Sequence, residues 1–285
     1  MFGAYLALLG RILLLGWERI VVKSLGEKAD SRVVAFHFFG IATLLMLPFV
    51  FFTARPSDYY FLIRVCISSL VYSASFSLYV KSLSMADASL VSPLYNFNVF
   101  FLLILTTVFL GESLTIYKIA GMSLLVYGAS FLSRQRNLLL SLGALFKNRA
   151  CLMMIVSSCL IAVGRTIDGD TVKSVSPLIY ATCLYAGISL VLFLVVVISG
   201  RRSEIISLVR ENPWTVLAAG AINSYSYLFL LISFTRIDVS VAEPSSMLSM
   251  VVTVFLARLI FREEIRERLI GVIIMIIGAW VLFYK

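Results

Sequence analysis

Apolar runs about as long as a membrane is thick follow one another along this chain. Of its 285 residues, 61% are hydrophobic and only 14% are charged, which is more apolar side chain than a soluble protein of this length can bury. A helix needs about 20 mostly apolar residues to cross the hydrocarbon. There the backbone must satisfy its own hydrogen bonds, so spans of this kind are helices. We therefore expect an all-α integral membrane protein.

The apolar runs predict ten transmembrane helices. The first residues lack a basic segment and a small-residue cleavage site, so they are interpreted as a first span and not as a cleaved signal. The short loops leave no room for a soluble domain. The expected spans cover residues 3–22, 33–52, 60–82, 89–110, 117–132, 151–172, 177–199, 214–235, 239–261 and 269–284.

Two stretches about 150 residues apart share their polar and conformational landmarks. Residues 88–114 and 239–265 align at a constant offset, and such internal repeats settle the architecture before other features do. The landmarks that coincide are Asp87 with Asp238, Pro93 with Pro244, and Glu112 with Glu263.

The alignment predicts two five-helix repeats, residues 1–135 and 150–285, joined by a basic linker over 136–149. Five spans is an odd number, so the second repeat enters the membrane from the side opposite to the first. Inverted repeats of this kind are typical of secondary carriers, whose substrate site lies near mid-membrane between the repeats.

Basic residues are concentrated in the loops that follow the odd-numbered spans. Short loops rich in Lys and Arg stay in the cytoplasm, so the bias predicts that both termini are non-cytoplasmic in a multi-pass protein of the cell membrane. The net charge of +9 is thereby explained as a membrane-flank signal. A nucleic-acid partner is not expected, because no basic face with stacking aromatics on a soluble module is visible.

Several motifs occur in an order that resembles the drug/metabolite transporter superfamily, in particular EamA-type carriers. They are the LGW segment at residues 15–17 followed by Lys23, the LGESLT turn at 110–115, and the glycines at 121 and 128. The resemblance covers nearly the whole chain. It implies a ten-helix basket in which spans three, four, eight and nine line a central cavity, and members that export amino acids or carry sugar nucleotides and phosphorylated sugars. The sequence departs from the family pattern in having Arg-Glu-Glu at 262–264 where Gly-Glu is usual.

Ionisable residues inside the spans are the first site candidates, because they are costly in a bilayer and tend to face cavities or one another. Arg11 and Glu18 share a face of span one, and Arg165 and Asp168 lie three residues apart on span six, where they can pair along the helix. One interpretation is internal ion pairs that hold the bundle together. The other assigns coupling to Glu18 and Asp168, with Arg11 or Arg165 receiving an anionic group.

Glu243 precedes Pro244 near the start of span nine and is followed by two serines. Proline removes a backbone donor and frees a carbonyl, so a carboxylate and hydroxyls beside it can form a small polar pocket that gates or binds the substrate. The alternative is a helix entrance with Pro in its first turn and an interfacial Glu.

Tyrosines and asparagines in spans three, four and eight are candidates for lining a cavity. Tyrosine combines an apolar body with a polar tip, which suits a small amphipathic solute, although packing through small and hydroxyl side chains explains most of the neighbouring serines. The residues selected as substrate-binding are Tyr72, Tyr79, Asn96, Asn223 and Tyr227.

His37, the single histidine, lies in span two. It is either a proton carrier, given its near-neutral pKa in water, or a satisfied packing residue. The four cysteines show no metal-ligand spacing and read as small hydrophobes. No enzyme motif and no cofactor are predicted.

The sequence therefore favours a secondary transporter that moves a small metabolite, an amino acid or a related amphipathic solute, by alternating access. Protons are candidate coupling ions, and the oligomeric state is left open. Two alternatives remain: a non-transporting scaffold or lipid-binding protein with the same fold, and an exchanger of anionic, phosphorylated solutes.

Overall fold

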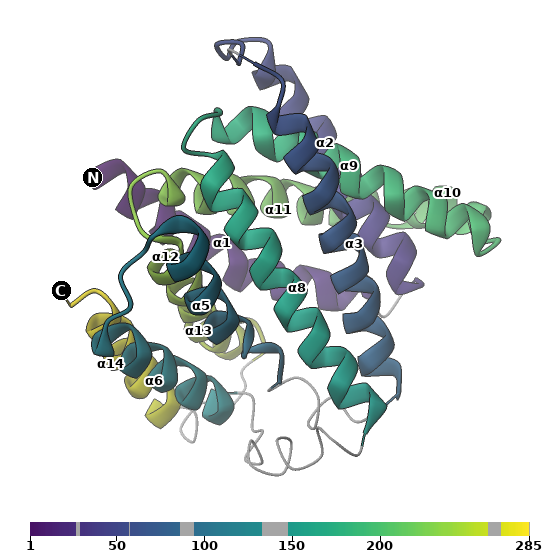
Figure 1. Ribbon diagram of the computed structural model, residues 1–285. Helices are drawn as coiled ribbons and strands as arrows, with labels where there is room; N and C mark the ends of the chain where they lie inside the picture. The colour runs from purple at the N-terminus through teal and green to yellow at the C-terminus, as the bar shows by residue number, and fades with distance from the viewer. Residues whose placement is uncertain (27–28, 57, 86–93, 133–147, 262–268, 285) are drawn as a thin grey trace. The chain divides into compact units, whose positions relative to one another are not determined.

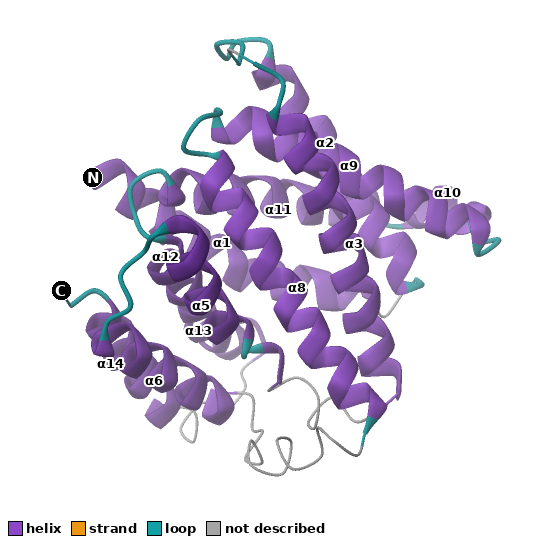
Figure 2. Cartoon of the chain, in the orientation of Figure 1, coloured by secondary structure: helices purple, strands orange, loops and turns teal. Residues whose placement is uncertain are grey.

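The computed structural model is helical throughout the part of the chain it describes, residues 1–26, 29–56, 58–85, 94–132, 148–261 and 269–284, and no strand occurs in those ranges (Figures 1 and 2). The linker over 136–147, Ser92, Pro93 and Glu263 lie outside the described residues. The helices are α1 (Phe2–Gly26), α2 (Ser31–Val50), α3 (Phe61–Met85), α5 (Asn98–Leu110), α6 (Ile116–Leu132), α8 (Arg149–Thr171), α9 (Pro177–Ile198), α10 (Arg202–Glu211), α11 (Pro213–Phe234), α12 (Val239–Ser245), the 3-10 turn η1 (Ser246–Leu248), α13 (Ser249–Phe261) and α14 (Leu269–Leu282).

Helical structure occurs at each of the ten predicted spans. Six segments of the described chain are long and apolar enough to cross a membrane, namely Ser31–Val50, Phe61–Tyr79, Arg149–Thr171, Pro177–Ile198, Pro213–Phe234 and Val239–Leu256, whereas α5 and α14 are shorter apolar helices. Large apolar side chains such as Phe109, Ile198 and Trp280 are more than two-thirds exposed. That exposure suits a lipid solvent and makes this a multi-pass membrane protein, while the total of ten crossings stays a prediction.

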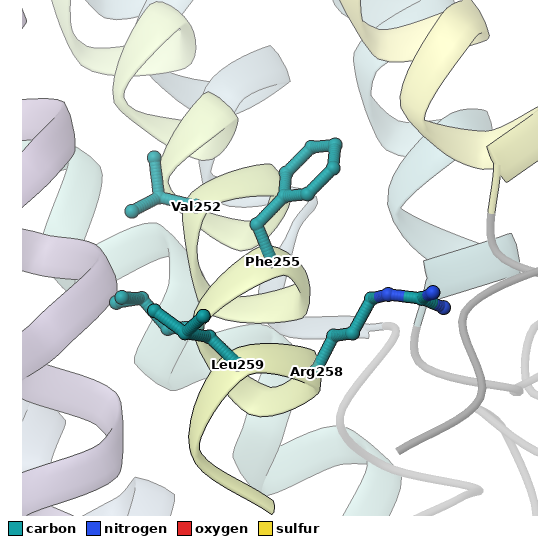
Figure 3. A pocket seen from close by; sticks show the side chains of 5 residues that line it. Val252, Phe255, Arg258 and Leu259 are labelled. Atoms are coloured by element: carbon teal, nitrogen blue, oxygen red, sulfur yellow. The ribbon is translucent and has the colours of Figure 1, made fainter. Parts of the chain in front are cut away.

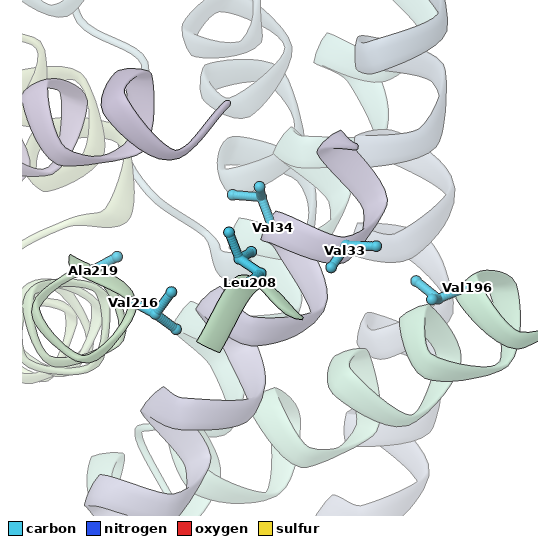
Figure 4. Packing of buried hydrophobic residues seen from close by; sticks show 6 residues of the cluster. All are labelled: Val33, Val34, Val196, Leu208, Val216 and Ala219. Atoms are coloured by element: carbon cyan, nitrogen blue, oxygen red, sulfur yellow. The ribbon is translucent and has the colours of Figure 1, made fainter. Parts of the chain in front are cut away.

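One helix was not predicted. The sequence predicts a loop between the seventh and eighth expected spans, but residues there form α10. The segment places apolar residues on one face at helical spacing, and on that face Leu208 is buried. Figure 4 shows Leu208 among Val33 and Val34 of α2, Val196 of α9, and Val216 and Ala219 of α11.

The described residues form two compact units. The first unit comprises residues 1–73 and 167–236, and the second comprises 74–166 and 237–285. Each unit therefore combines segments from both halves of the sequence, and α3 and α8 contribute residues to both units. In the first unit α1 packs on α11, and α2 packs on α9 and α11; in the second, α6 packs on α14.

Four glycines let α6 and α14 approach closely. A Cβ atom on Gly121 would lie 2.8 Å from the carbonyl oxygen of Gly278, and one on Gly128 would lie 2.9 Å from that of Gly271. The two glycines of α6 thus pack against the two glycines of α14. Small residues at such interfaces drive helix association where water is absent.

The ninth predicted span is interrupted. Pro244 lies in the interior of α12, not in its first turn, and η1 separates α12 from α13. In the other half a turn at residues 96–97 precedes α5. With the sequence offset of 151, α5 and α13 begin and end at equivalent positions, so both halves carry a discontinuity at the same place.

Candidate functional site

A buried carboxylate surrounded by tyrosines is the centre of the first unit. Asp168, near the C-terminal end of α8, has no exposed surface. The hydroxyl of Tyr180 donates to its Oδ1 at 2.8 Å, and that of Tyr227 donates to Oδ2 at 2.8 Å. Tyr72 also donates to Oδ2. Three helices, α3, α9 and α11, thus each bring one phenol to a single carboxylate.

These phenols are held by further polar contacts within the same unit. Tyr227 stacks on Tyr185, with ring centroids 4.8 Å apart. The Tyr185 hydroxyl donates to Oδ1 of Asn223 at 2.8 Å, and Nδ2 of Asn223 donates to the Phe38 carbonyl at 3.1 Å. The ring of Tyr227 is therefore held by a second set of contacts, which reaches α2 through Asn223.

Tyr180 connects the cluster to α3 a second time. Its hydroxyl lies 3.4 Å from Oγ of Ser68, which is fully buried. A phenol can donate one hydrogen bond and accept others, so Tyr180 can exchange the direction of its bonds between Ser68 and Asp168. The geometry gives the cluster a way to adapt to either protonation state of the carboxyl group.

Arg11 lies in the same unit, on α1. Its Nη1 donates to the Ser226 hydroxyl at 2.6 Å, and only 6% of the residue is exposed. Gly10 permits the close contact between α1 and α11, because a Cβ atom there would lie 2.7 Å from the Phe229 ring. Sequence reasoning grouped Arg11 with Glu18, which lies half-buried on the same helix.

The second unit contains a different buried charge site. Nε of Arg165 donates to Oε1 of Glu243 at 3.2 Å, and the two side chains are 12% and 11% exposed. Oε2 of Glu243 is buried without a hydrogen-bond partner. Glu243 lies immediately before Pro244, next to the interruption of the span. This partner of Arg165 comes from α12.

The remaining predicted residues do not join the Asp168 cluster. Tyr79 lies in the second unit, where its ring contacts Tyr95 edge-on with centroids 5.3 Å apart. Asn96 occupies the turn before α5 and is partly buried. Tyr72 and Tyr79 share a helical stripe, but they belong to different units.

His37 is buried in α2, and its Nδ1 makes a 2.9 Å hydrogen bond with the carbonyl of Val33 one turn earlier. This bond requires a proton on Nδ1, because a carbonyl only accepts. The contact favours the interpretation of His37 as a satisfied packing residue.

Glu112 and Lys118 fix the start of α12. The Glu112 carboxylate accepts from the amides of Val239 and Ser240 at 2.7 and 3.0 Å, which satisfies amides that no helical carbonyl can reach. Nζ of Lys118 donates to Asp238 and Ser240 at 2.8 and 2.9 Å. Glu112 thus caps a helix from the other half of the sequence.

An open hollow of about 560 Å3 lies along α13 (Figure 3). Val252, Phe255, Leu256, Arg258 and Leu259 line it. Leu259 is 79% exposed, and the lining contains none of the residues predicted for the site. The hollow therefore belongs neither to the Asp168 cluster nor to the Arg165–Glu243 pair.

Comparison with known proteins follows the same division of the chain. The model of the EamA-like transporter family matches residues 1–134 and 148–284. The chain belongs to the EamA-like transporter family. A solved structure titled "Crystal structure of protein" is 16% identical, covers 98% of this chain and 96% of its own, and gives a TM-score of 0.77; the likeness shows a shared fold. None of the curated proteins matches.

Membership of the EamA-like family makes the protein a membrane transporter of the drug/metabolite type. Sequence reasoning found Asp168, Tyr72, Tyr227 and Asn223, which the structure brings into one unit. It missed Tyr180 and Tyr185 of α9, because span seven carries no charge. A usable signal was present, since a phenol inside an apolar span needs a hydrogen-bond partner.

Proposed function

We propose that this EamA-like protein is a secondary transporter of an amino acid or a related amphipathic solute, coupled to protons through Asp168. The observation that carries the proposal is the fully buried Asp168 carboxylate with its three tyrosine hydroxyls. Ionisable groups at membrane depth are expensive, and proton relays are one of their uses.

The chemistry of the partners supports a protonation switch. A guanidinium can only donate, so an arginine partner cannot accept a hydrogen bond from the O–H of a protonated carboxyl group. A phenol can turn from donor to acceptor. The tyrosines can therefore keep the carboxyl group hydrogen-bonded in both protonation states. Asp168 can then bind and release a proton without leaving a buried polar group unpaired.

The architecture supports alternation between two conformations. The family match falls into two segments, the landmarks of the sequence repeat, and α5 and α13 correspond in length and position. Interrupted helices at corresponding positions of two halves are a feature of carriers that rock around a central site. The proposed inverted repeat, with both termini outside the cytoplasm of the cell membrane, gives each half the opposite orientation.

The test is uptake of radiolabelled amino acids into proteoliposomes with an imposed pH gradient. We expect wild-type protein to concentrate at least one of them and Asp168→Asn to abolish that concentration. Arg64→Gln is the matched control, because it removes a charge from an ion pair with Asp170 whose side chains are each 46% exposed. Gradient-driven uptake that survives in Asp168→Asn excludes the coupling role.

A further inference from the structure

Arg11 differs from the other basic side chains described above in the kind of group that it contacts. Lys118 pairs with Asp238, Arg165 with Glu243, and Arg64 with Asp170. Arg11 meets the hydroxyl of Ser226 and, among the residues the structure describes, no carboxylate. Its Nε is buried without a hydrogen-bond partner.

A buried cation with an unused donor is a costly arrangement. Removing an ion from water is expensive unless a counter-charge and further hydrogen bonds compensate for it, and inside a membrane such groups mark substrate or ion pathways. Because a guanidinium carries five donors in a planar fork that matches carboxylate and phosphate oxygens, the missing partner is expected to be an oxyanion.

We propose that Arg11 is the subsite for an oxyanionic group of the transported solute, a carboxylate or a phosphate. The inference rests on the proposed function, since the closed surroundings of Arg11 must open during transport for a solute to reach it. It selects Arg11 over Arg165, because Glu243 already occupies the guanidinium of Arg165.

The subsite is joined to the Asp168 cluster through α11. Ser226 binds Arg11, and its neighbour Tyr227 binds Asp168. An oxyanion that draws Nη1 of Arg11 away from Ser226 releases a hydroxyl next to the residue that holds the carboxyl group. The solute and the proton therefore act on adjacent positions of one helix.

Matched solute pairs test the proposal on the unaltered protein. The probes are L-phenylalanine with L-phenylalaninamide, and glucose 6-phosphate with glucose, in thermal unfolding and titration calorimetry in detergent. A ligand that binds only the folded state raises its midpoint. We expect the oxyanionic member of one pair to stabilise the protein and its counterpart not to; which pair responds decides between carboxylate and phosphate. Equal effects within each pair, or no effect of either oxyanion, overturn the proposal.

Variants locate the subsite. Arg11→Gln should weaken the effective oxyanion by at least about tenfold, since charge-assisted bonds are the strong ones, and Arg11→Lys should recover part of the loss. Arg64→Gln removes an arginine elsewhere in the unit and should bind within about threefold of wild type, a smaller change than the loss of one hydrogen bond to a charged group. Unchanged binding in Arg11→Gln refutes the assignment, and the solute pairs decide the matter if that variant does not fold.

The two proposals can fail separately. Loss of oxyanion binding in Arg11→Gln, together with wild-type proteoliposomes that show no gradient-driven uptake, supports the subsite and removes proton-coupled transport. Proton-driven uptake of the uncharged member of a pair supports transport and removes the subsite.

Discussion

Asp168 and Glu243 are both acidic residues with little or no exposed surface, but their surroundings differ. Phenols from three helices hold Asp168 in the first unit, whereas Arg165 holds Glu243 in the second. An ion pair between buried groups requires that both stay charged. A ring of hydroxyls makes no such demand. The comparison supports the proposed proton exchange at Asp168, and it favours a fixed structural contact between Arg165 and Glu243.

Breaking the ion pair should cost the most stability. Arg165→Gln leaves the Glu243 carboxylate buried without its cation, and removing one partner of a buried pair costs about 3–5 kcal/mol. Thermal unfolding in detergent should show a correspondingly lower midpoint. The double variant Arg165→Gln with Glu243→Gln should recover most of the loss. A double variant no more stable than Arg165→Gln would show that the two residues do not act as a pair.

Asp168→Asn should cost less, because a carboxamide oxygen still accepts from the phenols and the phenols can accept from its amide. We expect a loss of about 1–3 kcal/mol, the range for a hydrogen bond to a charged group, measured by the same unfolding assay. A loss as large as that of Arg165→Gln would remove the contrast between the two sites.

Single hydroxyl deletions should rank the three phenols. Tyr180→Phe and Tyr227→Phe each remove one 2.8 Å bond to Asp168 and leave the ring in place. Each should lower stability by about 1–2 kcal/mol and shift the pH dependence of uptake, which a purely structural tyrosine would leave unchanged. Asn223→Ala removes the hydrogen bonds to Tyr185 and to the Phe38 carbonyl and none to Asp168, so it provides a control for general loosening of the unit.

The smallest effect should come from Ser68→Ala. Its contact with Tyr180 is 3.4 Å long, and hydrogen bonds inside membrane proteins average about 0.6 kcal/mol. The unfolding midpoint should change little, while the rate of proton-coupled uptake should fall if Tyr180 changes bond direction during the cycle. An unaltered rate would show that Ser68 takes no part in proton-coupled uptake.

Much of the helical fold could be predicted because hydropathy and the lipid environment act locally. Helices occur at the predicted spans. Helix α10 was not predicted, because charged residues separate the apolar residues of its one buried face along the sequence. The interruption at Ser246–Leu248, two residues after Pro244, was not predicted.

The candidate site was harder to predict, because its members are brought together by packing between distant spans. Asp168 was recognisable as a buried charge. The sequence shows that the Tyr180 phenol needs a hydrogen-bond partner, but not that this partner is Asp168, and it does not show that Arg165 contacts Glu243. Helical spacing placed Tyr72 and Tyr79 on one stripe. Tertiary packing then separated them, and spacing along one helix cannot reveal that.

Proton movement evoked by the solute is the most direct test of the central claim. A pH-sensitive dye inside proteoliposomes would report protons when an amino acid that wild-type protein concentrates is added outside, without any imposed gradient. The account predicts a solute-dependent signal for wild type and for Arg64→Gln. It predicts none for Asp168→Asn, which should nevertheless exchange labelled for unlabelled solute. Proton movement that persists in Asp168→Asn would contradict the assignment of coupling to this carboxylate.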